Sequence, residues 1–264
     1  MKSLFIFLAL LMVSVSLSAQ SEITIRYIGN MGVLISDANN SVLIEGLHDE
    51  YRAESYTFPS DEVVQTLITK DGSEFPPITA VMATHFHQDH FDEALINRFL
   101  DANEYSVFIG SEQAVSEIDA GKDQLIPIST ATYQKQSVNL NGVKITSFYL
   151  NHVNPGRFDS IQNVGFLVEI NGFKILHIGD TNWFEEAFTA AELTALELDL
   201  AIMPFWMLMR EESKANFSKC ISADKIIATH LFYKDFEAYE KDILTFFPDA
   251  TLFTQPNESI TLKK

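Results

Sequence analysis

The sequence predicts an α/β fold, and three observations support this prediction. Short runs rich in β-branched and aromatic residues recur along the chain between turn-forming residues, which is typical of strands. Segments with apolar residues at helical spacing, such as residues 91–100 and 234–247, alternate with these runs. Apolar residues make up 47% of the 264-residue chain, which is enough for a full hydrophobic core.

The first 19 residues (1–19) have the layout of a secretory signal peptide. Lys2 supplies a positive charge, residues 4–13 are apolar, and the residues that follow are rich in small side chains. A membrane anchor is the weaker alternative, because this apolar run is too short to span a bilayer comfortably. We therefore expect an exported protein, periplasmic or secreted, that is cleaved after Ser18 or Ala19 and has no stable membrane anchor.

Residues 20–264 contain no repeats, linkers or low-complexity tracts, so we expect a single domain. The formal net charge of −18 argues against a nucleic-acid partner, because its phosphates would be repelled, and favours a small-molecule substrate. Cys220 is the only cysteine and cannot form an intramolecular disulfide. We expect it to pack in the core. The oligomeric state stays open.

Residues 20–264 begin with a predicted antiparallel meander. Three β-prone runs, residues 23–28, 33–36 and 41–45, are separated by turns rich in Gly, Asn and Asp. Later β-prone runs end at turn-forming residues or at a histidine. They predict further strands at residues 78–83, 105–109, 143–150, 163–170, 173–178, 198–203 and 224–230, with the short segments 251–254 and 259–262 completing the domain.

Amphipathic segments between these runs predict helices. Ser111 is a favourable N-cap for one of them. The long excursion at residues 50–77 predicts a wall of a binding site, and packing of its aromatic residues against the core is the alternative. The bulky apolar segment 205–210 is expected beside the mouth of the site. The predicted helices are residues 60–69, 91–100, 111–120, 182–195 and 234–247.

Three histidines and an aspartate are concentrated where the predicted strand 78–83 leads into a helix. His85 and His87 are two residues apart, so in extended backbone they point the same way. Asp89 and His90 follow where the chain turns and can face the same space. Imidazole nitrogens with a carboxylate oxygen suit zinc, and also manganese or iron. The motif therefore predicts a metal site at the end of this strand.

This His-x-His-x-Asp-His motif resembles that of the metallo-β-lactamase superfamily. Three later residues at strand ends match the superfamily's remaining ligand positions in order and approximate spacing: His152, Asp180 and His230. The resemblance implies an αββα sandwich of two mixed sheets flanked by helices. It also implies two divalent metals, most of all zinc, one held by His85, His87 and His152, the other by Asp89, His90 and His230, with Asp180 bridging.

The resemblance further implies a metal-dependent hydrolase. A hydroxide shared by the two metals would attack a small ester, lactone or phosphodiester, with Asp89 and Asp180 as the catalytic carboxylates. Asp180 argues against antibiotic hydrolysis, because true β-lactamases usually lack it. The chain looks closest to the branch with the ascorbate-phosphate lactonase and N-acyl phosphatidylethanolamine phospholipase D, although Asn30 and Glu45 depart from the usual residues. A protein that binds a metal or senses a ligand without turnover is the alternative.

Three residues near this site have open roles at this stage. Glu45 ends the third strand of the meander, where it either orients a ligand histidine or is an ordinary exposed carboxylate. His48 carries no motif spacing, so we expect a surface or supporting histidine rather than a ligand. His177 lies inside a strand and is expected to be a hydrogen-bonded core or supporting residue.

Overall fold

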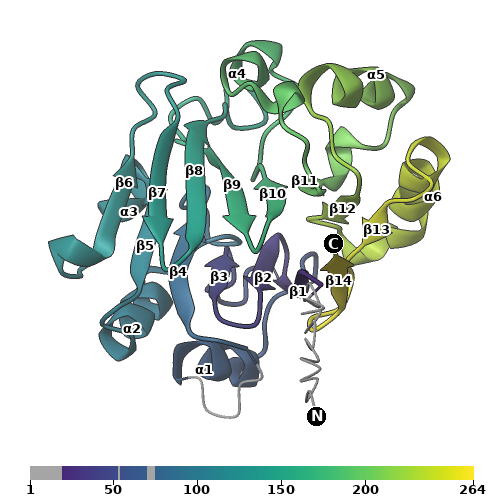
Figure 1. Ribbon diagram of the computed structural model, residues 1–264. Helices are drawn as coiled ribbons and strands as arrows, with labels where there is room; N and C mark the ends of the chain where they lie inside the picture. Colours follow the sequence, from purple (N-terminus) through teal and green to yellow (C-terminus); the bar gives the residue numbers. More distant parts are fainter. Residues whose placement is uncertain (1–19, 53, 70–74) are drawn as a thin grey trace, which may run out of the picture.

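Two seven-stranded sheets pack face to face, and helices cover the outer side of each sheet (Figure 1). A computed structural model describes residues 20–52, 54–69 and 75–264, and the predicted signal peptide lies outside these ranges. The αββα sandwich that the resemblance implies is confirmed.

The first sheet has the strand order β14-β1-β2-β3-β4-β5-β6. Strands β1 to β3 pair antiparallel, which confirms the predicted meander, and β3 to β6 pair in parallel. Its strands are β1 (Glu22–Gly29), β2 (Gly32–Ser36), β3 (Ser41–Ile44), β4 (Ile78–Ala83), β5 (Val107–Ser111), β6 (Leu125–Ile128) and β14 (Ser259–Lys263).

The second sheet has the order β13-β12-β11-β10-β9-β8-β7. Strands β7 to β10 are antiparallel, and β10 to β13 are parallel, so this sheet is also mixed. Its strands are β7 (Gln136–Leu140), β8 (Val143–Tyr149), β9 (Val164–Ile170), β10 (Phe173–His177), β11 (Leu200–Pro204), β12 (Ile226–Thr229) and β13 (Thr251–Leu252).

Alternate side chains of the strands fill the space between the sheets. In β9, Val164, Phe166 and Val168 point into this space, whereas Leu167 packs on the opposite face beneath the helices. Burial of both faces explains why these strands read as nearly continuous apolar runs in the sequence. The result is a rigid support for the loops at the strand ends.

The helices form the two outer layers. Their buried side chains complete one apolar cluster outside each sheet. Helices α1 (Asp61–Thr69), α2 (Glu93–Ala102) and α3 (Glu112–Val115) cover the first sheet, and α4 (Glu185–Ala190), α5 (Glu211–Cys220) and α6 (Phe236–Phe246) cover the second. Short 3-10 turns are η1 (Lys122–Gln124), η2 (Leu193–Ala195), η3 (Phe205–Met207) and η4 (Tyr233–Asp235).

Two predicted helices are shorter than expected. The prediction for residues 111–120 was wrong in length, because α3 ends at Val115; the Ser116 hydroxyl donates to the carbonyl oxygen of Gln113 (2.7 Å), a local bond that competes with the helix. Its N-cap was right, since Ser111 Oγ accepts from the Ala114 amide. The helix predicted for 182–195 is interrupted at Glu192, whose φ of 54° is left-handed.

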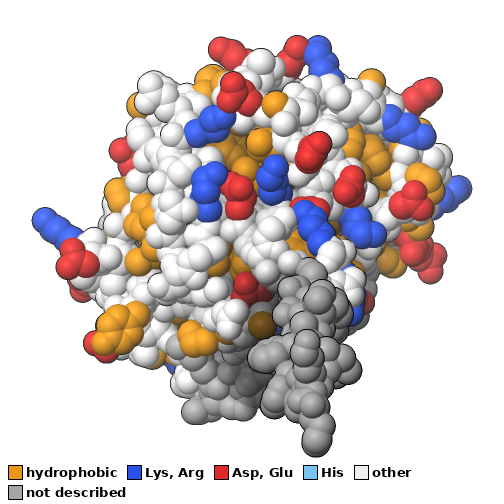
Figure 2. All heavy atoms as spheres, viewed as in Figure 1, with side chains coloured by type: hydrophobic (Ala, Val, Ile, Leu, Met, Phe, Trp, Pro, Cys, Tyr) orange, Lys and Arg blue, Asp and Glu red, His pale blue; other side chains and the backbone are white. Residues whose placement is uncertain are grey.

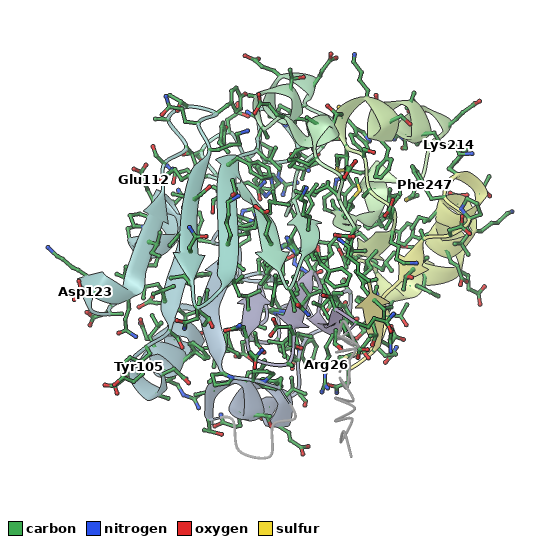
Figure 3. All side chains as sticks on the ribbon, in the orientation of Figure 1. Arg26, Tyr105, Glu112, Asp123, Lys214 and Phe247 are labelled. Atoms are coloured by element: carbon green, nitrogen blue, oxygen red, sulfur yellow. The ribbon has the colours of Figure 1, made fainter. Side chains whose placement is uncertain are left out.

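Helices α5 and α6 pack against each other beside the second sheet. The ring centroids of Phe217 and Phe247 lie 5.7 Å apart, and Lys214 Nζ lies 5.8 Å from the centroid of the Phe246 ring. Figure 3 shows Lys214 and Phe247 on the same side of the molecule. These contacts fix the position of α5, whose N-terminal end borders the site described below.

Acidic and basic side chains are interspersed on the face of the molecule that Figure 2 shows. Cys220 is buried, so its predicted place in the core is confirmed. Within the described ranges, no helix combines the length and apolarity that a membrane span requires.

Candidate metal centre

Four strand ends deliver the candidate ligands to one place. His85, His87, Asp89 and His90 follow β4, whereas the remaining three each follow a strand of the second sheet. These three strands (β8, β10 and β12) run in the same direction, because β9 is antiparallel to both β8 and β10, and β11 is parallel to both β10 and β12. Their carboxyl ends therefore share an edge of the sheet, from which they present His152, Asp180 and His230.

Backbone contacts lock these loops together. The Val153 amide donates to the carbonyl oxygen of Asp180 (2.8 Å), and the Val164 amide donates to that of Thr84 (2.9 Å). Gly179 has a φ of +59°, and a Cβ there would lie 2.6 Å from Asn163 Oδ1. A side chain at this position would push the Asp180 loop away from β4, so glycine is required here.

The first group consists of His85, His87 and His152. His85 Nε2 lies 3.1 Å from His87 Nδ1, and one nitrogen from each of the three rings lies within 4.8 Å of the others. The Thr84 hydroxyl donates to Glu45 Oε1, so it accepts from His85 Nδ1 (2.9 Å), which leaves the Nε2 lone pair facing the group. His152 Nδ1 donates to the Val153 carbonyl oxygen (2.9 Å), with the same consequence for its Nε2.

The second group consists of Asp89, His90 and His230, whose ligand atoms also lie within 4.8 Å of one another. His90 Nε2 lies 3.6 Å and His230 Nε2 lies 3.4 Å from Asp89 Oδ2. Asp180 joins this group with both oxygens, since Oδ1 lies 3.5 Å from His90 Nε2 and Oδ2 lies 3.5 Å from His230 Nε2.

Glu45 contacts the second group through His90. The Glu45 side chain is fully buried, and its Oε2 lies 3.0 Å from His90 Nδ1, so it orients that imidazole. The other oxygen, Oε1, accepts from the Thr84 amide (3.3 Å) and hydroxyl. Of the two roles left open by the sequence, the orienting one agrees with the structure, and the exposed one does not. One carboxylate oxygen of Glu45 also lies within 4.8 Å of a ring nitrogen of His85 and of His90, so these three residues form a third possible ligand group.

The two other histidines are buried, and neither belongs to a candidate ligand group of the described residues. His177 Nε2 donates to the carbonyl oxygen of Met31 (3.0 Å) and lies 3.7 Å from Glu45 Oε2, which agrees with a hydrogen-bonded core residue. His48 Nδ1 donates to the carbonyl oxygen of Asp49 (3.3 Å). His48 is 2% exposed and is therefore not a surface histidine.

Asn30 contributes to the site in a way that the sequence did not reveal. Its Nδ2 donates to the Asp89 carbonyl oxygen (2.9 Å) and lies 3.5 Å from His90 Nε2. Asn30, Glu45 and His230 all have a positive φ, between 48° and 62°. Such backbone strain in residues other than glycine is concentrated at functional sites, where the surrounding structure maintains it. No local sequence pattern marks these conformations.

Burial and mutual repulsion keep the first group neutral. Burial lowers the pKa of His85 well below its usual value, and the charge of His90 acts in the same direction. Burial also lowers the pKa of His87 to about 4, with further contributions from His152 and His90. The pKa of His152 is lowered by burial and partly restored by its bond to Val153 and by the Asp180 charge. Neutral imidazoles have lone pairs available for a metal.

Carboxylates dominate the second group. Burial alone would lower the pKa of His90, but Glu45, Asp180 and Asp89 raise it well above its usual value. The pKa of His230 is raised to about 9, because Asp180 and Asp89 outweigh its burial. In turn, the histidines hold the pKa of Asp180 well below the ordinary carboxyl range against the effect of burial. The carboxylates of Glu45, Asp89 and Asp180 therefore favour positive charge at this position.

The arrangement fits divalent cations. Buried polar atoms normally have hydrogen-bond partners. Here His152 Nε2, His230 Nε2 and Asp180 Oδ1 are buried without one among the described residues. These atoms belong to residues of the two groups, and imidazole nitrogens with carboxylate oxygens form the donor set that zinc, manganese and iron accept.

A cavity of about 1030 Å³ opens above the two groups. Its lining includes Tyr51, Arg52 and Tyr56 from the predicted wall, and Trp206 and Arg210 from the segment that was expected beside the mouth. Its floor includes His87, Asp89, His152, Asp180 and His230. A small molecule that enters this cavity therefore meets both groups of candidate ligands.

Comparison with known families agrees with this geometry. Residues 57–231 match the model of the Beta-lactamase superfamily domain. The chain belongs to the β-lactamase superfamily. All seven candidate ligands fall within the matched residues, and with the two groups described above the chain is a metal-dependent hydrolase of the metallo-β-lactamase fold.

Several known proteins are similar to this chain over most of its length. The chain is 23% identical over 257 residues to a UPF0173 metal-dependent hydrolase of Natranaerobius thermophilus, and this match covers 90% of the chain and 99% of that protein. A second such hydrolase, from Methanosarcina barkeri, is 25% identical to this chain, and the match covers 69% of this chain and 80% of that protein. The structure of Igni18, a metallo hydrolase from Ignicoccus hospitalis, shares the fold with a TM-score of 0.61 at 15% identity, covering 91% of this chain and 98% of its own.

Proposed function

We propose that this protein is an exported hydrolase that holds two divalent metals, most of all zinc, and cleaves a small ester, lactone or phosphodiester. The single observation that carries the proposal is the closeness of the two candidate ligand groups, whose His85 and His90 ring centroids lie 4.2 Å apart, together with buried ligand atoms that lack hydrogen-bond partners among the described residues. Both oxygens of Asp180 lie 3.5 Å from histidine nitrogens of the second group. His85, His87 and His152 would hold one metal, and Asp89, His90 and His230 the other, with Asp180 shared.

The bound metals would supply positive charge for the developing oxyanion and activate a water molecule for attack. The protein's own residues prepare this chemistry. Thr84 and Glu45 fix the ring orientations of His85 and His90 through the contacts described above. Asn30 Nδ2 lies 3.4 Å from Asp89 Oδ2 and donates to the Asp89 backbone, so it positions this carboxylate in the floor of the cavity.

Asp89 is the group that we assign to accept a proton during the reaction. Its pKa is held below the ordinary carboxyl range, because His90 and His230 outweigh the effect of burial, so the carboxylate is ionised at neutral pH. Asp89 is 8% exposed and faces the cavity, so it can accept the proton that the attacking water gives up. A cavity of this size suits a small molecule rather than a polymer.

The proposal is tested with the metal-loaded protein and a panel of esters, lactones and phosphodiesters, in which each ester and lactone is supplied both as a neutral compound and with an added anionic group. We expect hydrolysis of at least one substrate class, loss of that activity with a chelator, and its return when zinc or manganese is added back. Metal-loaded protein that binds these compounds but hydrolyses none of them would favour the ligand-sensing alternative instead.

A further inference from the structure

Arginines are concentrated at the cavity in a strongly acidic protein. The chain has only five arginines, and three of them line the cavity: Arg52, Arg157 and Arg210. None of the described residues that line it is a lysine. Because the formal net charge is −18, guanidinium groups at this one opening form a local reversal of the surface charge.

Carboxylates neutralise these arginines only weakly. Arg210 Nη1 lies 3.7 Å from Glu212 Oε1, but both side chains are exposed, which makes such a pair weak. Arg52 and Arg157 form no ion pair with any described residue. Instead, Arg52 Cζ lies 5.1 Å from the centroid of the Tyr51 ring, and Arg157 Cζ lies 4.8 Å from that of Phe158. Stacking on a ring holds a guanidinium in place and leaves its N–H donors available.

Aromatic rings separate the arginines from the candidate metal ligands. The Phe158 ring that carries Arg157 lies 5.2 Å from the ring of His87 and 5.0 Å from that of His152. On another side, Tyr51 stacks on Tyr56 at 6.3 Å. Histidines therefore form the floor, aromatic rings form the wall, and arginines form the rim.

The same arrangement of histidine floor, aromatic wall and arginine rim is found around His230. The rings of Tyr56 and Trp206 each lie 5.0 Å from the His230 ring, in edge-to-face contact. Arg52 lies over the ring of Tyr51, which stacks on Tyr56. Arg210 follows Trp206 in sequence, at the start of α5. A ligand that extends from the floor would pass an apolar surface before it reaches the positive rim.

We infer that the substrate is a small amphipathic anion, with its scissile group at the metal centre, an apolar body along the aromatic wall, and an oxyanion group at the rim, where Arg52, Arg157 and Arg210 supply guanidinium donors. This inference rests on the proposed function, because it concerns the substrate of the same cavity. Carboxylates and phosphates share the chemistry that guanidinium groups recognise. The overall charge of −18 disfavours a polyanion such as a nucleic acid, so the rim suits a single anionic group.

Tryptophan fluorescence provides a direct assay of cavity binding. The chain has two tryptophans, Trp183 and Trp206, and both line the cavity. Metal-loaded protein is titrated with 4-phenylbutyrate, 3-phenylpropylphosphonate and the neutral 4-phenylbutanamide. We expect at least one anion to bind about tenfold more tightly than the amide. The stronger of the two anions identifies whether the rim prefers a carboxylate or a phosphate-like group.

Variants separate the rim from the metals, which also attract anions. Arg157→Gln is expected to reduce the preference for the anion about three- to fivefold, and Arg157→Lys to retain most of it, since charge-assisted hydrogen bonds contribute on this scale. Arg52→Gln and Arg210→Gln are measured in the same way. Arg98→Gln removes an exposed charge from α2, away from the cavity, and is the matched control. All three rim side chains are exposed, so these changes leave the core intact.

Two results would overturn the inference. One is equal binding of the amide and both anions by the wild-type protein. The other is an anion preference that is the same in all three rim variants as in Arg98→Gln, because the metals alone would then bind the anion. The proposed function has its own readout, which is chelator-sensitive hydrolysis of any member of the ester, lactone and phosphodiester panel, with or without an added anionic group. An intact rim preference without such hydrolysis would refute the hydrolase, and the reverse pattern would refute the rim.

Discussion

Replacement of Asp180 by asparagine tests the role of the shared carboxylate. Asp180 Oδ1 lies 3.5 Å from His90 Nε2, and Oδ2 lies 3.5 Å from His230 Nε2, so its two oxygens reach two ligands of the second group. The substitution Asp180→Asn keeps the size of the side chain but removes its negative charge. One oxygen becomes an NH₂ donor, which cannot ligate a metal.

The expected loss follows from these contacts. Removal of one electrostatic contact in an active site typically lowers kcat by about 10²–10³-fold. Because Asp180 would serve both metals, we expect the upper part of this range, together with metal content falling from two per chain toward one. Steady-state hydrolysis and elemental analysis measure the two effects. Asp101→Asn, at the exposed end of α2, is the matched control and should change neither. Equal activity of the two variants would refute the shared role of Asp180.

Three further predictions concern other parts of the molecule. Glu45→Gln should weaken metal affinity about 10–100-fold, because Glu45 orients His90. Equilibrium metal titration measures this change, and an unchanged affinity would contradict the orienting role of Glu45. Cys220 should react slowly with iodoacetamide in the folded protein and rapidly in urea, because burial hides the thiol and raises its pKa; fast native labelling would contradict its place in the core. Mass spectrometry of the protein from its natural source should find a chain that begins at Ala19 or Gln20, and an intact Met1 would contradict export.

Much of the site could be predicted because its residues stand at the ends of recognisable strands. The motif from His85 to His90 is local, and His152 and Asp180 follow β-prone runs with clear turn residues. The role of Glu45 could not be decided from the sequence, because it depends on a contact with His90 that arises only when β3 pairs with β4. The contribution of Asn30 depends in the same way on a long-range contact.

The rest of the fold was harder to predict for physical reasons. Helix α5 buries only Ser213 and Cys220, so it has almost no amphipathic pattern and was not predicted. Strand β7 contains polar residues and has no fully buried position, and it was missed as well. The arginine rim comes from three distant segments of the chain. No spacing in the sequence connects them.

Metal stoichiometry is the measurement that tests the central claim most directly. Elemental analysis of the purified protein, saturated with zinc and then desalted, should approach two metals per chain. His152→Ala should lose the metal of the first group, and His230→Ala that of the second, so each variant should retain about one. Wild-type protein that retains close to no metal under these conditions would contradict the account.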